Sequence, residues 1–257
     1  MTRRLIINWQ HEESRRILPV AELLVDATES SFEFGYIEGV RAARKLGFQP
    51  FVAFPEIDRR YVSDDLFPFF RNRILPTTRP DYLEYVEALG LTLDTANAVD
   101  LLGRSAGRRH TDRIETVLAA EKDATTGGYL AHFLVRGVRY VPGAEAVVLE
   151  LQVGTKLDVA FDVTNPVKPL ARHLCFKGKP IGFVSDYLLP DLQALDAASA
   201  KPSFTVVRVN PEPVPAHHRV LVRVDAEWPL GFQPFSGTEF RPVTPVEQQV
   251  RASLAPA

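Results

Sequence analysis

The stretch from Phe133 to Leu189, FLVRGVRYVPGAEAVVLELQVGTKLDVAFDVTNPVKPLARHLCFKGKPIGFVSDYLL, carries the pattern that decides the fold. Residues 156–163 within it alternate apolar and more polar side chains, and residues 219–224 do so again further on. Alternation with a period of two is typical of half-buried strands. The sequence therefore predicts antiparallel β structure here, with the proline-rich stretch 210–215 connecting the last two strands.

The landmarks of this stretch come in a defined order. An apolar strand runs into Arg136-Gly137 and Arg139-Tyr140, and a short helix, a strand and the turn at Asn165-Pro166 follow. Ile181-Gly182-Phe183-Val184 then leads into a helix. In order and spacing, residues 129–228 resemble the HIRAN domain, a family of small β-barrels best known as binders of nucleic-acid ends attached to DNA-repair helicases. The resemblance implies a small antiparallel barrel with short helices that binds DNA.

The turn after Asn165 departs from the family. HIRAN domains usually read Asn-Pro-Tyr-Asp-x-Asn-Ala, whereas this chain reads Asn165-Pro166-Val167-Lys168-Pro169-Leu170-Ala171. In the family, the aromatic and acidic residues of this turn help to hold the terminal nucleotide. With Val167 and Lys168 in their place, we expect little preference for a free 3′ hydroxyl.

Composition sets the broad class. With 257 residues and 46% hydrophobic content, the chain is globular, and two domains of ordinary size are expected. A net charge of −2 provides no global basic field, so contact with nucleic acid requires a local patch. One cysteine excludes an internal disulfide framework, and the apolar run Leu5–Ile7 is too short for a signal or membrane segment, which together predict a cytoplasmic protein.

The first half mixes short strands with helices, so the fold class expected for the chain is α+β. Strands are expected at 5–7 and 32–34, and helices at about 37–46, 63–75, 80–89 and 95–102, several of which end at a glycine. The polar stretch Glu121–Gly128 reads as a linker. We therefore predict domains at 1–120 and 129–228, followed by a tail at 229–257.

A second resemblance covers about 34–117. Residues 49–55, Tyr61, residues 66–76, residues 89–91 and residues 100–103 are similar to the N-terminal subdomain of HipA-type toxin kinases. In that family the subdomain precedes a kinase core, or exists as a separate partner that neutralises it. This chain has no catalytic loop with the required acidic motif, so the resemblance implies a protein-interaction role, with a possible protein partner bound through 34–117.

Residues that suggest catalysis stand in the wrong context. Gly103-Arg104-Ser105-Ala106-Gly107 matches a nucleophile elbow, but a helix rather than a strand is expected before Ser105. His217 and His218 are adjacent rather than at metal-ligand spacing, Cys175 is expected to be buried in a strand, and no phosphate-binding loop occurs. We expect no enzyme activity, no cofactor and no metal.

The remaining candidate site is basic and aromatic, as a groove for single strands requires. It consists of Arg136, Arg139, Tyr140, Asn165, Lys168, Arg172, Lys177, Lys179 and Tyr187, with His173 nearby. The alternative is ordinary solvated charge, diluted by aspartates at 158, 162, 186 and 191.

These residues lead to two functional hypotheses. The leading prediction is a non-enzymatic adaptor that binds single-stranded or terminal DNA, and the competing one is a protein-interaction module with a degenerate DNA pocket. A second basic cluster, Arg104, Arg108, Arg109, His110 and Arg113, could extend a nucleic-acid path or meet an acidic protein.

Overall fold

The computed structural model describes residues 2–26, 28–109, 111–162 and 171–245. Mixed helices and antiparallel sheets make the fold α+β, as predicted. The chain divides into two compact units that are discontinuous in sequence. The first comprises residues 1–79, 96–119 and the chain from 235 onward, and the second comprises residues 80–95 and 120–234. Among the described residues, none of the helices combines the length and apolar character needed to cross a membrane.

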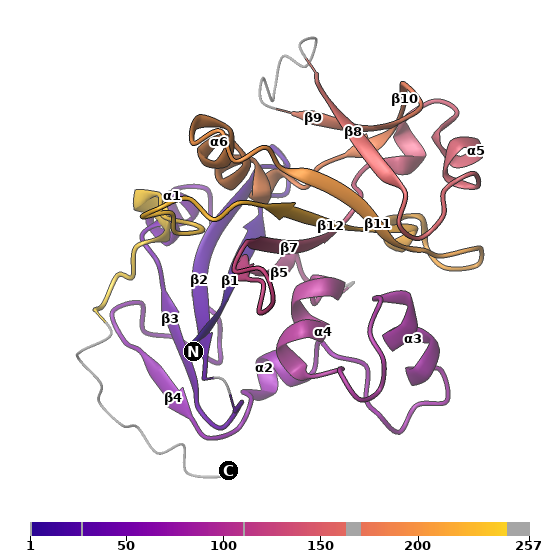
Figure 1. Cartoon of the computed structure of the whole chain (residues 1–257). Helices are drawn as coiled ribbons and strands as arrows, with labels where there is room; N and C mark the ends of the chain where they lie inside the picture. The colour runs from indigo at the N-terminus through magenta and orange to yellow at the C-terminus, as the bar shows by residue number, and fades with distance from the viewer. Residues whose placement is uncertain (1, 27, 110, 163–170, 246–257) are drawn as a thin grey trace. The chain divides into compact units, whose positions relative to one another are not determined.

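A five-stranded antiparallel sheet, in the order β4-β3-β2-β1-β5, organises the first unit (Figure 1). One face of this sheet packs against aromatic side chains, and the rings of Phe34 and Phe54 stack 3.8 Å apart. The strands are β1 (Arg3–Gln10), β2 (Ile17–Val25), β3 (Phe32–Tyr36), β4 (Tyr61–Ser63) and β5 (Ile114–Leu118), and the helices are α1 (Gly39–Lys45), α2 (Pro68–Arg71) and α4 (Ala98–Ser105).

The second unit is built on a seven-stranded antiparallel sheet in the order β10-β9-β8-β11-β12-β7-β6. Its strands are β6 (Glu121–Lys122), β7 (Tyr129–Leu134), β8 (Lys156–Phe161), β9 (Arg172–Phe176), β10 (Lys179–Phe183), β11 (Ser203–Val209) and β12 (Val220–Ala226). Among the described residues no pairing joins β10 to β6, so the predicted closed barrel is not confirmed.

Short helices complete the second unit. They are α3 (Tyr82–Ala88), α5 (Ala144–Val148) and α6 (Leu189–Ala197), with the 3-10 turns η1 (Val138–Tyr140), η2 (Asp186–Leu188) and η3 (Ala216–His218). Within this unit α5 lies beside the part of the sheet that contains β10 (Figure 1). Phe133, Leu174, Ile181 and Val222 belong to the core of the second unit, to which α5 and α6 also contribute.

Two predicted helices have different bounds in the structure. The helix expected over 63–75 is reduced to α2, Pro68–Arg71. Gly103 does not end its helix, because α4 continues to Ser105 and closes at Ala106 with a left-handed backbone. Gly103 is instead required by packing, since a Cβ there would lie 2.6 Å from the Cβ of Leu118.

The stretch predicted as a linker is a hairpin. Glu121–Lys122 pairs with β7, and Asp123 accepts backbone hydrogen bonds from Thr125 and Thr126 at 2.9 and 2.7 Å, which closes the turn. The compact units also assign residues 80–95 to the second unit, unlike the predicted range 1–120. Whether 1–120 and 129–228 fold as separate domains stays a prediction.

The described part of the stretch predicted as a tail, 229–257, contains two buried aromatic side chains. Phe235 and Phe240 are 2% and 8% exposed and their ring centroids lie 4.9 Å apart, with Phe240 closing the 3-10 turn η4 (Thr238–Phe240). The sequence pattern missed them because two isolated phenylalanines in a proline-containing stretch show no periodicity.

Candidate nucleic-acid interface

The candidate interface lies at the edge strand β10 and at the turn η1, which contacts that strand. At the C-terminal end of β10, the Arg136 amide donates to the Phe183 carbonyl at 2.9 Å, and the Phe183 amide donates back at 2.8 Å. Gly137 follows with a left-handed backbone at φ 72°, and a Cβ there would lie 3.2 Å from the Phe183 ring. This glycine therefore turns the chain over Phe183 and places η1 next to β10.

Tyr140 is the most exposed aromatic side chain of this surface. Tyr140 is 71% exposed, and the guanidinium carbon of Arg139 lies 4.5 Å from its ring centroid. Arg139 also donates to the Tyr140 hydroxyl. A cation stacked on an exposed ring offers both groups that single-stranded nucleic acid uses, a positive charge for a phosphate and a flat face for a base.

Two lysines lie at the other end of β10. Lys177 and Gly178 both have positive φ, 50° and 75°, which is the backbone of the tight hairpin turn that connects β9 to β10. Lys177 forms an ion pair with Glu150 at 3.2 Å. Lys179 is exposed, and the described residues include no hydrogen-bond or ion-pair partner for it. Lys179 is therefore the more available cation of the pair.

Arg136 is half-buried rather than projecting. Its Nε donates to the Ser185 hydroxyl at 3.3 Å, and that buried hydroxyl donates to the Leu134 carbonyl at 3.3 Å. These contacts connect the residue to β7 and to the chain after β10. They hold the Arg136 guanidinium beside the bridge that positions η1.

Arg172, a predicted phosphate contact, is buried. Its side chain is 5% exposed, forms an ion pair with Asp196 at 2.8 Å, and lies with its guanidinium carbon 5.0 Å from the Phe161 ring centroid. A guanidinium held in this way is a structural element of the second unit. Sequence alone did not reveal this, because the partner Asp196 comes from α6, far along the chain.

Of the remaining predicted residues, Tyr187 lies within the described part of the chain. Tyr187 is half-buried and packs against the core of the second unit. Asn165 and Lys168 lie outside the described residues, as do Val167 and most of the turn that departs from the HIRAN pattern.

Sequence reasoning missed one aromatic contact beside this surface. Phe183 stacks against His173 with ring centroids 4.2 Å apart, and His173 Nε2 lies 3.6 Å from a carboxylate oxygen of Asp162. The β9–β10 register pairs Phe183 with His173. This contact can be found from the sequence only once that register is known.

The second basic cluster is largely neutralised. Arg108 forms an ion pair with Glu115, and Arg113 with Glu12. Burial lowers the pKa of Arg104, against the opposing effect of the nearby Asp100 carboxylate. His110 lies outside the described residues. Because carboxylates accompany these cations, the cluster offers a weaker anion-binding surface than its composition indicated.

The nucleophile candidates are held in structural contacts. Ser105 lies in the last turn of α4, and its hydroxyl donates to the Leu101 carbonyl at 2.7 Å, so the residues before it are helical as expected. Cys175 is buried in β9, and burial raises the pKa of its thiol. Neither arrangement presents an activated nucleophile.

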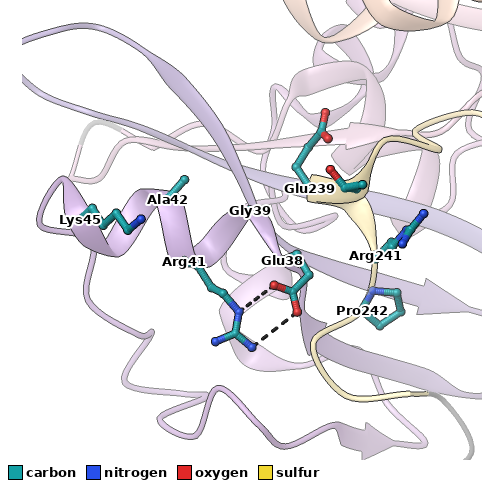
Figure 2. Close-up of a pocket in the computed structure, with 9 residues that line it drawn as sticks. Glu38, Gly39, Arg41, Ala42, Lys45, Glu239, Arg241 and Pro242 are labelled. Atoms are coloured by element: carbon teal, nitrogen blue, oxygen red, sulfur yellow. Dashed lines mark hydrogen bonds and ion pairs between the residues drawn. The ribbon is translucent and has the colours of Figure 1, made fainter.

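An open cleft of about 590 Å³ occurs in the first unit, between α1 and residues 238–242. Figure 2 shows Arg41 turned back onto Glu38, with which it forms an ion pair at 2.7 Å, while Glu239 and Arg241 lie on the other side. Charges of both signs line this cleft, so it provides no selective site for an anion. It is lined by Glu38, Gly39, Arg41, Ala42, Lys45, Thr238, Glu239, Arg241 and Pro242.

Comparison with known proteins assigns no family. No family model matches the chain, and no curated protein matches it. A crystal structure of a protein from Lactobacillus plantarum is similar at 15% identity and a TM-score of 0.32, covering 43% of this chain and 96% of that one. The crystal structure of the HIRAN domain of human HLTF is similar at 18% identity and a TM-score of 0.28, covering 38% of this chain and 74% of that one. These likenesses are too partial to carry a functional argument.

Proposed function

We propose that the second unit binds nucleic acid, single-stranded or terminal DNA in particular, through the surface formed by η1, β10 and the β9–β10 turn. This η1–β10 surface consists of Arg139, Tyr140, Lys177 and Lys179, with Arg136 holding η1 in place. The observation that carries the proposal is the exposed Tyr140 ring with Arg139 stacked on it, beside a strand whose other end carries exposed lysines. The resemblance of 129–228 to HIRAN domains supports the same function.

The dimensions suit a short stretch of single strand. Lys179 and Phe183 are the two ends of β10, and four steps of a strand span about 13 Å. An oligonucleotide lying along β10 therefore meets a lysine at one end and the Arg139–Tyr140 pair at the other. A base stacks on Tyr140 while the cations contact phosphates, a division of roles that depends little on base sequence.

The strength of binding should depend strongly on salt. The chain has a net charge of −2, so attraction comes from the local cations rather than from a global field. For single strands, each phosphate contact contributes about −0.7 to the slope of log K against log salt. Lys177 shares its charge with Glu150, so Arg139 and Lys179 should account for most of that slope.

Fluorescence polarisation of a labelled 12-nucleotide DNA with the full-length protein tests the proposal. Lys179→Ala should weaken binding to all sequences alike and flatten the salt slope by about 0.7. Lys45→Ala, which removes an exposed lysine from the first unit, is the matched control and should change neither quantity. Equal effects of the two variants would mean that binding is diffuse and does not use this surface.

A protein-interaction role is the second candidate. It is favoured by the carboxylates that already pair with two of the predicted cations, Lys177 with Glu150 and Arg172 with Asp196. It is also the role implied by the resemblance of 34–117 to the HipA subdomain, which stays a prediction. Absence of binding to any DNA at low salt would make this the better account.

We also propose that the protein acts without catalysing a reaction. Ser105 is buried in a helix and Cys175 in a strand, which is the support for this view. Purified protein should show no ATPase, esterase or kinase turnover. Turnover that Ser105→Ala abolishes, with the fold preserved by circular dichroism, would contradict this expectation.

A further inference from the structure

The second face of the five-stranded sheet carries a fixed network of charges. Arg4, Glu22 and Glu33 come from β1, β2 and β3, and Arg60 joins them from the chain before β4. Glu22 accepts from Arg4 Nε at 2.9 Å and from Arg60 Nη1 at 3.0 Å, and Glu33 accepts from Arg60 Nε. We call these four residues the arginine platform.

A glycine lets the platform lie flat on the sheet. Glu22 is paired with Gly35 in the β2–β3 register, and the Arg60 guanidinium rests over Gly35. A Cβ at Gly35 would lie 2.7 Å from Arg60 Nη1, so a larger residue would displace it. Because two carboxylates and a glycine fix the guanidiniums, their outward N–H groups are preorganised for a ligand.

The chain's own segment 235–244, the C-terminal strap, occupies this platform. Arg4 donates to the carbonyls of Phe235 at 3.3 Å and of Phe240 at 2.6 Å, and Arg60 donates to the carbonyl of Thr244 at 3.4 Å. The strap thus meets the platform through its backbone carbonyls, and its Phe235 and Phe240 side chains are buried with their ring centroids 4.9 Å apart.

The strap also pairs through its backbone with residues 36–38 of the first unit. The Glu38 amide donates to the Arg241 carbonyl at 2.8 Å, the Val243 amide donates to the Tyr36 carbonyl at 3.0 Å, and Ile37 forms an isolated bridge with Pro242. The strap, which contains the 3-10 turn η4, is therefore held by main-chain bonds at residues 36–38 and by two buried aromatic side chains.

The fit between the strap and its seat is incomplete at one atom. Arg60 Nη2 is buried and has no hydrogen-bond partner among the described residues, although a buried donor normally has one. The open cleft of about 590 Å³ in Figure 2 lies at the surface beside this seat, between α1 and residues 238–242. The platform therefore offers more contacts than its present occupant uses.

From these observations we propose that the arginine platform is a peptide-binding site, and that the strap is its resident, displaceable occupant. The partner is a peptide of another protein that adopts the turn of the strap. It carries two aromatic side chains at the spacing of Phe235 and Phe240, main-chain carbonyls for Arg4, and an acceptor for Arg60 Nη2. This site belongs to the first unit and does not depend on DNA binding by the second.

Hydrogen exchange on the full-length wild-type protein tests whether the strap opens by itself. The amides of Glu38 and Val243, which bond across the strap, should exchange together and about tenfold or more faster than the paired amides of β1 and β2. If they exchange only at the rate of the sheet, the strap is an integral part of the fold and the proposal is wrong.

Binding of a labelled peptide with the sequence of residues 234–245, PFSGTEFRPVTP, tests the site itself. The full-length double variant Phe235→Ala/Phe240→Ala should bind this peptide about tenfold or more tightly than wild type does, because the wild-type strap competes at an effective concentration in the millimolar range. A control peptide with serine at both phenylalanine positions should bind neither protein. Adding Arg4→Met to the double variant should weaken binding, since methionine keeps the stem and removes the donors. If the double variant folds but does not bind the peptide, the proposal is wrong. If the double variant does not fold, the hydrogen-exchange measurement on the wild-type protein decides.

Discussion

Replacing Arg172 by methionine should destabilise the second unit by about 1–2 kcal/mol, while removing no contact to nucleic acid. Loss of one partner from a fully buried ion pair costs about 3–5 kcal/mol, because the other charge stays buried and unpaired. Here the Arg172 side chain is 5% exposed but that of Asp196 is 44% exposed, so water can hydrate the remaining carboxylate. Methionine keeps the stem packed near Phe161, and the lost cation–π contact accounts for about 0.5–1 kcal/mol of the total.

The two tryptophans make this measurement specific. Trp9 packs in the core of the first unit and Trp228 against that of the second, so Trp9→Phe leaves one fluorescent reporter for the second unit. Urea unfolding in that background should show a lower midpoint for Arg172→Met. The control Arg223→Met breaks a pair with Asp225 at 2.9 Å, whose side chains are 46% and 35% exposed, and should cost at most about 1 kcal/mol. An unchanged midpoint for Arg172→Met together with weaker DNA binding would refute the structural role and restore Arg172 as a phosphate contact.

Two further predictions concern stability. Burial alone would raise the pKa of Asp100, but the hydrogen bond and charge of Arg3 outweigh it and hold that pKa below its ordinary value. The carboxylate therefore stabilises the first unit above about pH 4 and loses this effect as the pH falls through its folded pKa, so Asp100→Asn should lower the melting temperature at pH 7 by more than at pH 3. A difference that is the same at both pH values would contradict this assignment. The second unit of the Gly182→Ala protein should unfold at a lower urea concentration than that of the Gly178→Ala protein. A Cβ at Gly182 would lie 2.5 Å from a side-chain carbon of Val135, whereas a Cβ at Gly178 would have no atom within 4 Å. Equal midpoints of the two alanine variants would show that the β10 edge relaxes freely around the added methyl group.

Local patterns predicted much of the secondary structure. The helices that end near Gly47 and Gly90 were foreseen, and both glycines adopt positive φ after them. Strands with clear alternation, such as β8 and β12, were also foreseen. These features depend on a few neighbouring residues, which is why a single sequence can reveal them.

Features that depend on pairing partners outside the segment itself were missed. The two-residue strand β6 is defined by its hairpin with the nearby β7, and its polar composition alone indicated a linker. The burial of Phe235 and Phe240 depends on a sheet formed more than 190 residues earlier, at β1 to β3. Nothing in the local sequence of either segment carries that information.

The candidate site shows the same division. Arg139 and Tyr140 were predicted from their adjacency, and their stacking is a local contact between neighbours in the chain. Whether the other cations are available to a ligand depends on nearby carboxylates. Arg172 is paired with Asp196 and Lys177 with Glu150, whereas Lys179 is exposed. Charge counting along the sequence cannot make this distinction.

The central claim is tested most directly by the affinity of the Tyr140→Ala protein for a labelled single-stranded 12-mer. Tyr140 is 71% exposed, so the fold should survive the change, and the account predicts a loss of about 1–3 kcal/mol with an unchanged salt slope. Leu230→Ala, a truncation of a fully exposed apolar side chain in the same unit, should bind like wild type. Tyr140→Ala protein that binds DNA as tightly as wild type would contradict the η1–β10 surface as the nucleic-acid site.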